Sequence, residues 1–210
     1  MAISINGSTN VITGVGVGGL PDGIVDADML ASNAVTSGKL ASGVGGKVLQ
    51  VVQLSKTDTA SVTIGGAPSI SPDAISHSIT PSASTSKVLV RASICVGTNQ
   101  ANRAIYAHLY RGGSVVSGAR GNADSNRQQV SAVTFIDNLN LSGISNRIAM
   151  FTHEYLDSPN STSSLTYSYR FSNDNPSGNR TLWINREETN TDNSVSARAY
   201  SSITLMEVAA

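Results

Sequence analysis

The glycines near the start of the chain have the spacing of a phosphate-binding loop. Gly14, Gly16 and Gly19 fit the pattern G-x-G-x-x-G, which in dinucleotide-binding folds follows a strand and opens a helix whose backbone amides hold the phosphate. Here the glycines run into residues 20–23 (LPDG), a turn sequence. Without a helix N-terminus a phosphate has no aligned donors. We therefore interpret these glycines as a slender backbone segment and not as a nucleotide site.

Acidic and histidine side chains are too scattered to predict a metal or catalytic centre. In the segment 153–157 (HEYLD), His153 has no second histidine four residues later, as a zinc motif would require. Glycan hydrolysis needs two carboxylates about 5–10 Å apart across a sugar cleft. The acids available for that role fall mostly at expected strand ends or turns: Asp137, Glu154, Asp157, Glu187 and Glu188. We predict that the protein is not an enzyme and has no catalytic residue.

The segment 185–193 (NREETNTDN) gathers oxygen donors of the kind that bind a hard cation such as Ca²⁺. It lacks the ligand spacing and the glycine of an EF-hand loop. A polar hairpin tip is the simpler interpretation of this segment. We expect no metal and no cofactor in the chain.

Neutral polar residues dominate the composition. The 210 residues include 32 Ser, 17 Thr and 17 Asn, whereas only 13% are charged, with 14 basic and 14 acidic side chains. A net charge of zero provides no electrostatic attraction to nucleic acid. The apolar runs are far shorter than the roughly 20 residues that span a bilayer, and the first residues lack the pattern of a signal peptide. We therefore expect no nucleic acid, no membrane insertion and synthesis in a cytoplasm, and we expect the single cysteine, Cys95, to be a buried side chain.

The sequence divides near residue 45. Residues 1–45 are rich in Gly, Ala, Ser and Val and carry no aromatic residue, so only residues 46–210 can form a core of their own. Residues 25–32 (VDADMLAS) and 35–42 (VTSGKLAS) form a repeat in which each copy allows one helical turn. Repeats that cannot bury their own apolar side chains need neighbours, and identical chains around an axis can supply them. We predict that the following residues face an oligomer axis: Val25, Leu30, Val35 and Leu40.

From Lys47 onward, apolar residues recur with a period of two, which predicts β strands. The alternation is clearest in residues 165–171, where Leu165, Tyr167, Tyr169 and Phe171 fall on one face. Short strands separated by turn clusters, without helical patterns between them, predict an antiparallel, jelly-roll-like β-sandwich. The expected strands are 47–54, 61–64, 75–80, 87–97, 103–110, 130–139, 147–156, 165–171, 181–186 and 197–207.

Several segments resemble the tail fibre and receptor-binding proteins of tailed bacteriophages, especially phages of aquatic bacteria. Residues 2–8 (AISINGS), residues 18–23 (GGLPDG) and the Val-x-x-x-x-Leu-Ala-Ser repeats are similar to the fibre shafts of that family. Residues 46–53 (GKVLQVVQ) are similar to the start of its distal β domain, and residues 181–186 and 201–208 are similar to the closing strands. The resemblance implies a homotrimer with an N-terminal shaft mounted on the virion and a C-terminal sandwich facing the host. The predicted oligomer axis is then a trimer axis.

On this basis we expect a short trimeric tail fibre, assembled in the host cytoplasm and exposed on the virion exterior, that mediates adsorption to the bacterial surface. The expected partners are two further copies, a virion protein bound through residues 1–45 (baseplate, tail adaptor or capsid), and bacterial surface polysaccharide. Neutral polar loops with a few aromatic residues suit sugars, so we expect contacts in residues 118–127, 157–164 and 173–180. The alternatives are a capsid head fibre or decoration protein with a mainly structural role and a glycan depolymerase.

Overall fold

The computed structural model describes most of the chain from residue 46 onward and short stretches before it. The described residues are 4–6, 11–13, 30–32, 34–36, 39, 46–66, 69–98, 103–136, 148–175, 178–190, 192, 194 and 196–210. The chain divides into two compact units, Met1–Gly46 and Lys47–Ala210.

In the first unit, the described residues form a hairpin and tight turns. Strand β1 (Ser4–Asn6) pairs antiparallel with β2 (Val11–Thr13). Backbone hydrogen bonds of 2.9 Å close one turn within residues 31–34 and another within residues 36–39. The turn at 36–39 falls within the second copy of the repeat, where a single turn was expected, whereas the turn at 31–34 follows Leu30 and lies after the turn expected in the first copy.

Two of the four residues predicted to face an oligomer axis are described. Leu30 is 44% exposed and Val35 is 50% exposed, so about half of the surface of each residue is uncovered. Val25 and Leu40 lie outside the described residues. The axis, the shaft and the trimer stay predictions.

The second unit confirms the prediction of a mainly β protein. Its strands are β3 (Val48–Lys56), β4 (Ala60–Ile64), β5 (Ile75–Ile79), β6 (Lys87–Thr98), β7 (Arg103–Arg111), β8 (Ser114–Val115), β9 (Ala132–Ile136), β10 (Ile148–Asp157), β11 (Leu165–Asn173), β12 (Arg180–Ile184) and β13 (Ser201–Val208). One short 3-10 helix, η3 (Ser117–Ala119), follows β8. Each expected strand is found within a few residues of its predicted bounds, whereas the two-residue strand β8 was not predicted. Within the described residues, no helix has the length and apolar character needed to cross a membrane.

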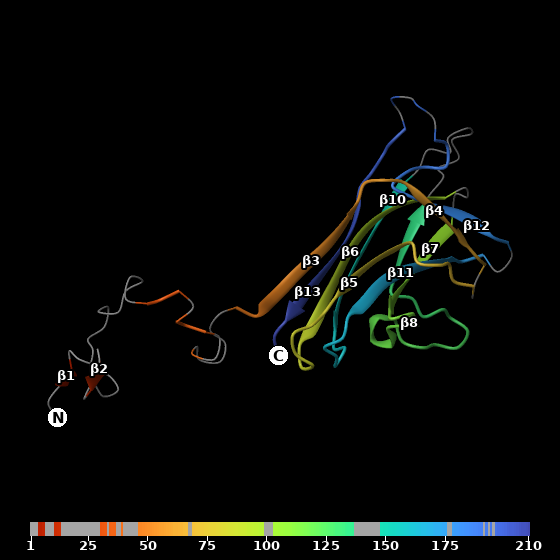
Figure 1. Cartoon of the computed structure of the whole chain (residues 1–210). Helices are drawn as coiled ribbons and strands as arrows, with labels where there is room; N and C mark the ends of the chain where they lie inside the picture. The colour runs from red at the N-terminus through yellow and green to blue at the C-terminus, as the bar shows by residue number, and fades with distance from the viewer. Residues whose placement is uncertain are drawn as a thin grey trace. The chain divides into compact units, whose positions relative to one another are not determined.

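Six strands form one antiparallel sheet, called the β6 sheet below. Strand β10 pairs with one edge of β6, and β13 and β12 pair with successive parts of the other edge. Strands β3 and β4 pair in turn with β13 and β12 (Figure 1). Strands β12 and β13 therefore form one line in the sheet, which residues 185–200 interrupt.

The other five strands form a second antiparallel sheet, called the β7 sheet below. Strand β11 lies between β5 and β7, and β8 and β9 pair with the opposite edge of β7 near its two ends. Both sheets are antiparallel, as predicted. Because successive side chains of a strand point to opposite faces, each sheet has an inner face in the core and an outer face.

The two sheets share one hydrophobic core. In β11, Tyr167, Tyr169 and Phe171 are fully buried, which confirms the shared face predicted from their alternation. Phe151 of β10 packs against two of these rings, with centroids 5.4 Å from Tyr169 and 6.0 Å from Phe171. The β6 sheet adds aliphatic side chains: Val88, Val90, Ile94, Val96, Leu182, Ile184, Ile203 and Leu205. Each such side chain stabilises the layered arrangement by about 1.5–3 kcal/mol when fully buried.

A buried carboxylate joins three strands. Asp157, the last residue of β10, is only 5% exposed. It accepts hydrogen bonds from the Tyr167 hydroxyl, at 2.6 Å, and from the guanidinium of Arg111. Burial and the adjacent carboxylate raise the pKa of Tyr167, so the phenol stays protonated and donates. The partners supply the compensation that a buried carboxylate requires.

Asn185 fixes the point at which the chain leaves the β6 sheet. It is fully buried and has a φ of +63°, in the left-handed region that asparagine tolerates better than most residues. Its Nδ2 donates to the carbonyl oxygens of Lys56, at 2.8 Å, and Asp58, at 2.9 Å, and its Oδ1 accepts from Ser201 Oγ at 2.5 Å. One side chain thus joins the exit and the return of residues 185–200. For this reason β12 ends at Ile184, before the expected end at residue 186, and β13 begins at Ser201, after the expected start at residue 197.

Cys95 is buried in β6, as predicted. Burial raises the pKa of its thiol, which keeps the group protonated and disfavours thiolate chemistry. Its backbone N–H donates to Ser201 Oγ at 2.9 Å. Cys95 is therefore part of the packing around the interruption of the sheet.

Candidate functional site

A pocket of about 360 Å³ opens on the outer face of the β7 sheet. We call it the arginine pocket. Strand β7 and the segment between β8 and β9 supply most of its lining, which consists of Ile70, His108, Tyr110, Val115, Arg120, Arg127, Gln128 and Gln129. Arg120 and Arg127 belong to residues 118–127, one of the three loops in which ligand contacts were expected.

The segment between β8 and β9 is fastened to β7 at both ends. At its start, the buried Val116 donates its N–H to the carbonyl of Leu109 at 2.9 Å. At its end, Ser131 donates its N–H to the carbonyl of Ala107 at 2.8 Å, and its Oγ accepts from Leu109 N at 3.0 Å. A loop held in this way on a sheet presents its side chains from a rigid scaffold.

Gly118 allows helix η3 to pack closely against β10. A Cβ atom at this position would lie 2.3 Å from Tyr155 Oη, so a larger residue would displace either the ring or the loop. Ala119 is 6% exposed and belongs to the core. Arg120 follows directly, so its position depends on these two contacts.

Arg120 stands out among the cations of the pocket. Its Nε is buried and has no hydrogen-bond partner within the described part of the chain. Buried donors are nearly always paired in native proteins. Arg127, by contrast, forms an ion pair with Asp124, and both side chains of that pair are exposed.

Tyr110 is held in place by a third arginine. The guanidinium of Arg170 lies 4.2 Å from the centroid of the Tyr110 ring, a cation–π distance. Arg170 Nε also donates to Asp73 Oδ1 at 2.6 Å, and Ser168 Oγ donates to the same oxygen at 2.8 Å. The carboxylate of Asp73 is therefore already bound by its neighbours on the outer face.

His108 is a buried and neutral part of the pocket. It is 4% exposed, and its Nε2 lies 2.9 Å from Ser172 Oγ. Burial, helped by the positive charge of Arg120, lowers the pKa of His108 to about 4. The imidazole therefore carries no charge at neutral pH.

The ionic groups in and beside the pocket leave one unbalanced positive charge. Arg127 is neutralised by Asp124, and Arg170 by Asp73. Arg120 remains without an ion pair among the described residues. The arrangement can therefore hold a small negatively charged group next to Arg120.

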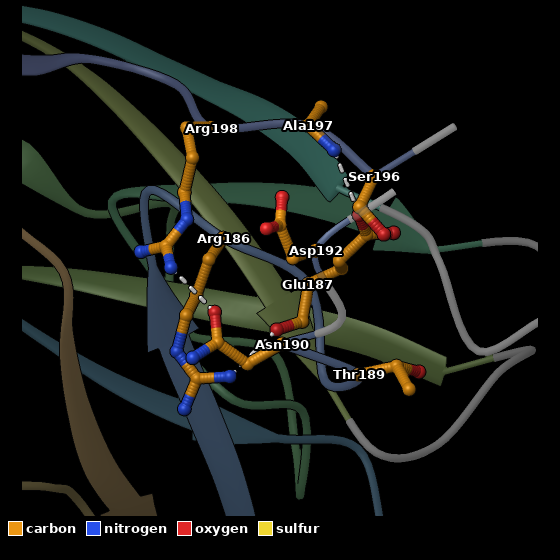
Figure 2. Close-up of a pocket in the computed structure, with 8 residues that line it drawn as sticks. All are labelled: Arg186, Glu187, Thr189, Asn190, Asp192, Ser196, Ala197 and Arg198. Atoms are coloured by element: carbon orange, nitrogen blue, oxygen red, sulfur yellow. Dashed lines mark hydrogen bonds between the residues drawn. The ribbon is translucent and has the colours of Figure 1, made fainter. Parts of the chain in front are cut away.

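A second pocket, of about 200 Å³, lies within residues 185–198 (Figure 2). Arg198 donates to Asn190 Oδ1 at 2.5 Å, and the N–H of Ala197 donates to Glu187 Oε1 at 2.7 Å. These polar groups satisfy one another across the turn. Its lining comprises Arg186, Glu187, Thr189, Asn190, Asp192, Ser196, Ala197 and Arg198.

The described acidic and histidine residues do not gather into a group that could hold a metal ion. His153 and Glu154 lie on opposite faces of β10, as successive residues of a strand do. His153 Nδ1 lies 2.7 Å from Tyr169 Oη in the interior, and burial lowers the pKa of the imidazole. Glu154 is exposed on the outer face, 3.9 Å from Arg91.

The acids considered for glycan hydrolysis have separate surroundings. Asp157 is bound by Arg111 and Tyr167, and Glu187 is 3% exposed with one oxygen bound to a backbone amide. Asp137 lies outside the described residues. Asp157 and Glu187 therefore serve local structure, and the expectation that the chain is not an enzyme stays a prediction.

The two other loops in which contacts were expected are shaped by their own hydrogen bonds. In residues 157–164, Asn160 has a φ of +51°, and Ser161 Oγ accepts from the N–H of Ser163 at 3.0 Å. In residues 173–180, Asn173 Nδ2 donates to the carbonyl of Gly65 at 2.9 Å. Residues 176 and 177 lie outside the described part.

The sequence did not single out His108, Tyr110 or Arg170. Their alternation with core residues in β7 and β11 is a usable signal, because it puts them on the face opposite the core. The signal is incomplete, because the pairing of β7 with β11 brings together residues about 60 positions apart, such as His108 and Arg170.

Comparisons with known proteins show no family for this chain. No protein-family model matches it, and no curated protein does. Solved structures match part of it. The structure of infectious bursal disease virus Gx strain matches with a TM-score of 0.38 and 10% sequence identity. The T=1 particles derived from infectious bursal virus match with a TM-score of 0.37 and 11% identity, and the infectious bursal disease virus VP2 subviral particle matches with a TM-score of 0.36 and 11% identity. Each match covers 76% of this chain but only 37%, 36% and 38% of the other chains, so this chain spans little more than a third of their length. At these values the similarity assigns no function.

Proposed function

We propose that the chain is a structural protein of a bacteriophage particle: a short, non-catalytic, trimeric fibre that attaches the particle to glycan on the bacterial surface. The resemblance of residues 25–32 and 35–42 to fibre shafts supports the phage assignment. The arginine pocket carries the attachment role. It offers amide, guanidinium and phenol groups on a rigid scaffold, and these groups match sugar hydroxyls and sugar faces.

Exposed apolar side chains support the proposed trimer. Leu30 and Val35 are about half exposed in a single chain, and burying them requires a partner. A second set crosses the outer face of the β6 sheet as directly paired neighbours on four strands, which we call the apolar row: Val51, Met206, Leu89 and Leu156. Its two end residues, Val51 and Leu156, are 54% and 44% exposed.

We assign the apolar row to contact between copies of the chain. The row begins in β3, which starts two residues after the first unit ends. Chains held together through the first unit would therefore bring this strand close to other copies. The row carries no charge, so copies can meet there without burying unpaired ions.

A trimer also explains how a modest pocket could hold a particle. Each pocket is small and open, so a single contact with a sugar would be weak. Three pockets on one fibre, and several fibres on one particle, raise the effective concentration of the second and third contacts. Avidity would then provide the attachment.

Binding of the labelled full-length protein to a panel of bacterial isolates tests the proposal. We expect retention on the cells of at least one isolate and loss of retention after periodate oxidation of surface glycans. Absence of retention on every isolate, including the strain that propagates the particle, would contradict the attachment role. Immunogold labelling of particles then separates a tail fibre from a head fibre or decoration protein.

Light scattering tests the oligomeric state. The full-length chain is expected to have the mass of a trimer, and a chain starting at Lys47 is expected to associate less strongly. A monodisperse full-length monomer at micromolar concentration would contradict both the axis and the apolar row as sites of association.

A further inference from the structure

We propose that the arginine pocket binds an oxyanion, the carboxylate or phosphate group of an acidic surface polymer. This inference rests on the proposed attachment function and names the ligand class of its site. Arg120 would be the anchoring residue. The sequence, with its zero net charge and neutral loops, favours neutral sugars instead.

The first support is the unused donor of Arg120. Its Nε is buried without a hydrogen-bond partner in the described structure, and no described carboxylate pairs with its charge. A guanidinium presents a planar fork of donors that matches carboxylate and phosphate oxygens, often with two parallel hydrogen bonds. A neutral sugar hydroxyl would leave the charge uncompensated, whereas an oxyanion satisfies the donor and the charge together.

The second support is the composition of the pocket wall. The lining contains two arginines and two glutamines but no acidic residue. His108 is neutral and therefore does not compete with Arg120 for the anion. Gln129 holds the loop closed by donating Nε2 to the carbonyl of Gly121 at 2.8 Å. Gln128 is exposed at the rim, where its amide can bind a neighbouring sugar hydroxyl.

The outer face of the β6 sheet also carries an arginine, which serves as a comparison for Arg120. Arg91, on the β6 sheet, lies 3.9 Å from Glu154, and both side chains are largely exposed. An exposed, paired arginine has little to gain from another anion. Arg91 therefore provides a matched control for Arg120.

Binding of defined polymers to the full-length protein tests the proposal. Polygalacturonate supplies carboxylates, a poly(glycerol phosphate) supplies phosphodiesters and dextran supplies neutral sugar. We expect binding to at least one acidic polymer at low salt, a lower affinity at high salt because ions screen the attraction, and no comparable binding to dextran. The two acidic polymers separate the two possible sources of the oxyanion.

Variants identify the residue that carries the binding. Arg120→Met should weaken binding of the acidic polymer about tenfold or more, since hydrogen bonds to charged groups are the strong ones. Arg120→Lys should restore part of the affinity, because it keeps the charge but loses the fork. Arg91→Met should bind like the unaltered protein. An unchanged thermal unfolding midpoint identifies the variants that remain folded. Arg127→Gln, at an exposed position, removes a second positive charge of the pocket lining and provides a second test of the pocket charge.

Equal affinity of the unaltered protein and a folded Arg120→Met would overturn the inference, as would dextran binding as strong as that of the acidic polymers. Retention on cells is measured with the same proteins. Retention that is unaffected by Arg120→Met leaves the attachment function standing and removes the oxyanion site. Absence of retention by the unaltered protein removes the attachment function itself.

Discussion

The two sheets of the second unit enclose one core but present different outer faces. On the β6 sheet, paired neighbours form the apolar row and a parallel row of hydroxyls made of Ser55, Ser202, Ser93 and Thr152. The row between them contains the exposed ion pair of Arg91 and Glu154. On the β7 sheet, the outer face carries a bonded network of charged and aromatic groups around Tyr110. Strand rows whose charges are paired suit contact with a second flat surface, whereas a pocket with an unpaired cation suits a small charged ligand.

The difference extends to how each face uses its loops. The arginine pocket depends on a long segment that returns to β7 and is fastened there by Val116 and Ser131. The hollows on the β6 sheet are similar in size, at about 350 and 390 Å³, but they are formed by strand residues alone, among them Arg91 and Ser93. Specific recognition is therefore expected where a loop covers a sheet, and association is expected where the strands are bare.

A substitution in the shared core should disturb both faces at once. Phe151→Ala removes a ring that packs between the sheets and is 1% exposed, so it should lower the free energy of unfolding by about 3–5 kcal/mol. Phe135→Ala makes the same change at a position on β9 that is 53% exposed and should cost about 0.5 kcal/mol or less. Urea unfolding measures both. Equal costs would contradict the shared core.

The next largest effect is expected at the buried carboxylate. Asp157→Asn keeps the shape of the side chain but removes the charge that binds Arg111 and Tyr167. We expect a loss of about 2–3 kcal/mol, the scale of hydrogen bonds to charged groups. Glu154→Gln, at an exposed pair, should change stability by less than about 0.5 kcal/mol. If both variants unfold alike, Asp157 does not join the strands as described.

These stabilising features differ in how far the sequence predicts them. Alternation places Tyr167, Tyr169 and Phe171 on one buried face because the period of a strand is fixed by its backbone. The ends of β12 and β13 could not be predicted. They depend on Asn185 binding Lys56, which is 129 positions away in the sequence, and local patterns carry no information on such a contact.

The candidate site shows the same limit. Residues 118–127 were predicted as a contact loop from their polarity alone, and the arginine pocket includes two of them. The part of the pocket formed by His108 and Tyr110 was not predicted. It depends on the pairing of β7 with β11 and on the contact of Arg170 with the Tyr110 ring. Polarity identifies a surface loop, but only the fold decides which of its side chains is left unpaired.

A change in the apolar row should weaken association without affecting the arginine pocket. Leu156→Ser removes an exposed leucine at the end of the row, and we expect a loss of about 1 kcal/mol of association free energy per chain from the lost apolar burial. Val133→Ser makes a similar change on β9, where the valine is 57% exposed, and should leave association unchanged. Analytical ultracentrifugation measures both. A stronger effect of Val133→Ser would move the interface to the other sheet.

The smallest effect at neutral pH is expected at His108, where acid should reveal it. Its pKa is lowered to about 4 in the folded protein, from an ordinary value of 6.5. The unfolded chain therefore takes up a proton at a higher pH than the folded protein, and the stability that depends on a neutral His108 should fall as the pH drops from about 6.5 to about 4. His108→Gln should remove this part of the acid sensitivity.

Arg120→Met should raise the pKa of His108 towards its ordinary value, because the positive charge of Arg120 helps to lower it. A titration of the imidazole by NMR measures the shift in pKa. The His108 signal is assigned with the His108→Gln variant, because burial also lowers the pKa of His153. Titration of His108 near 6.5 in the unaltered protein would contradict the burial of the imidazole beside Arg120, and it would remove the electrostatic contrast between the two outer faces.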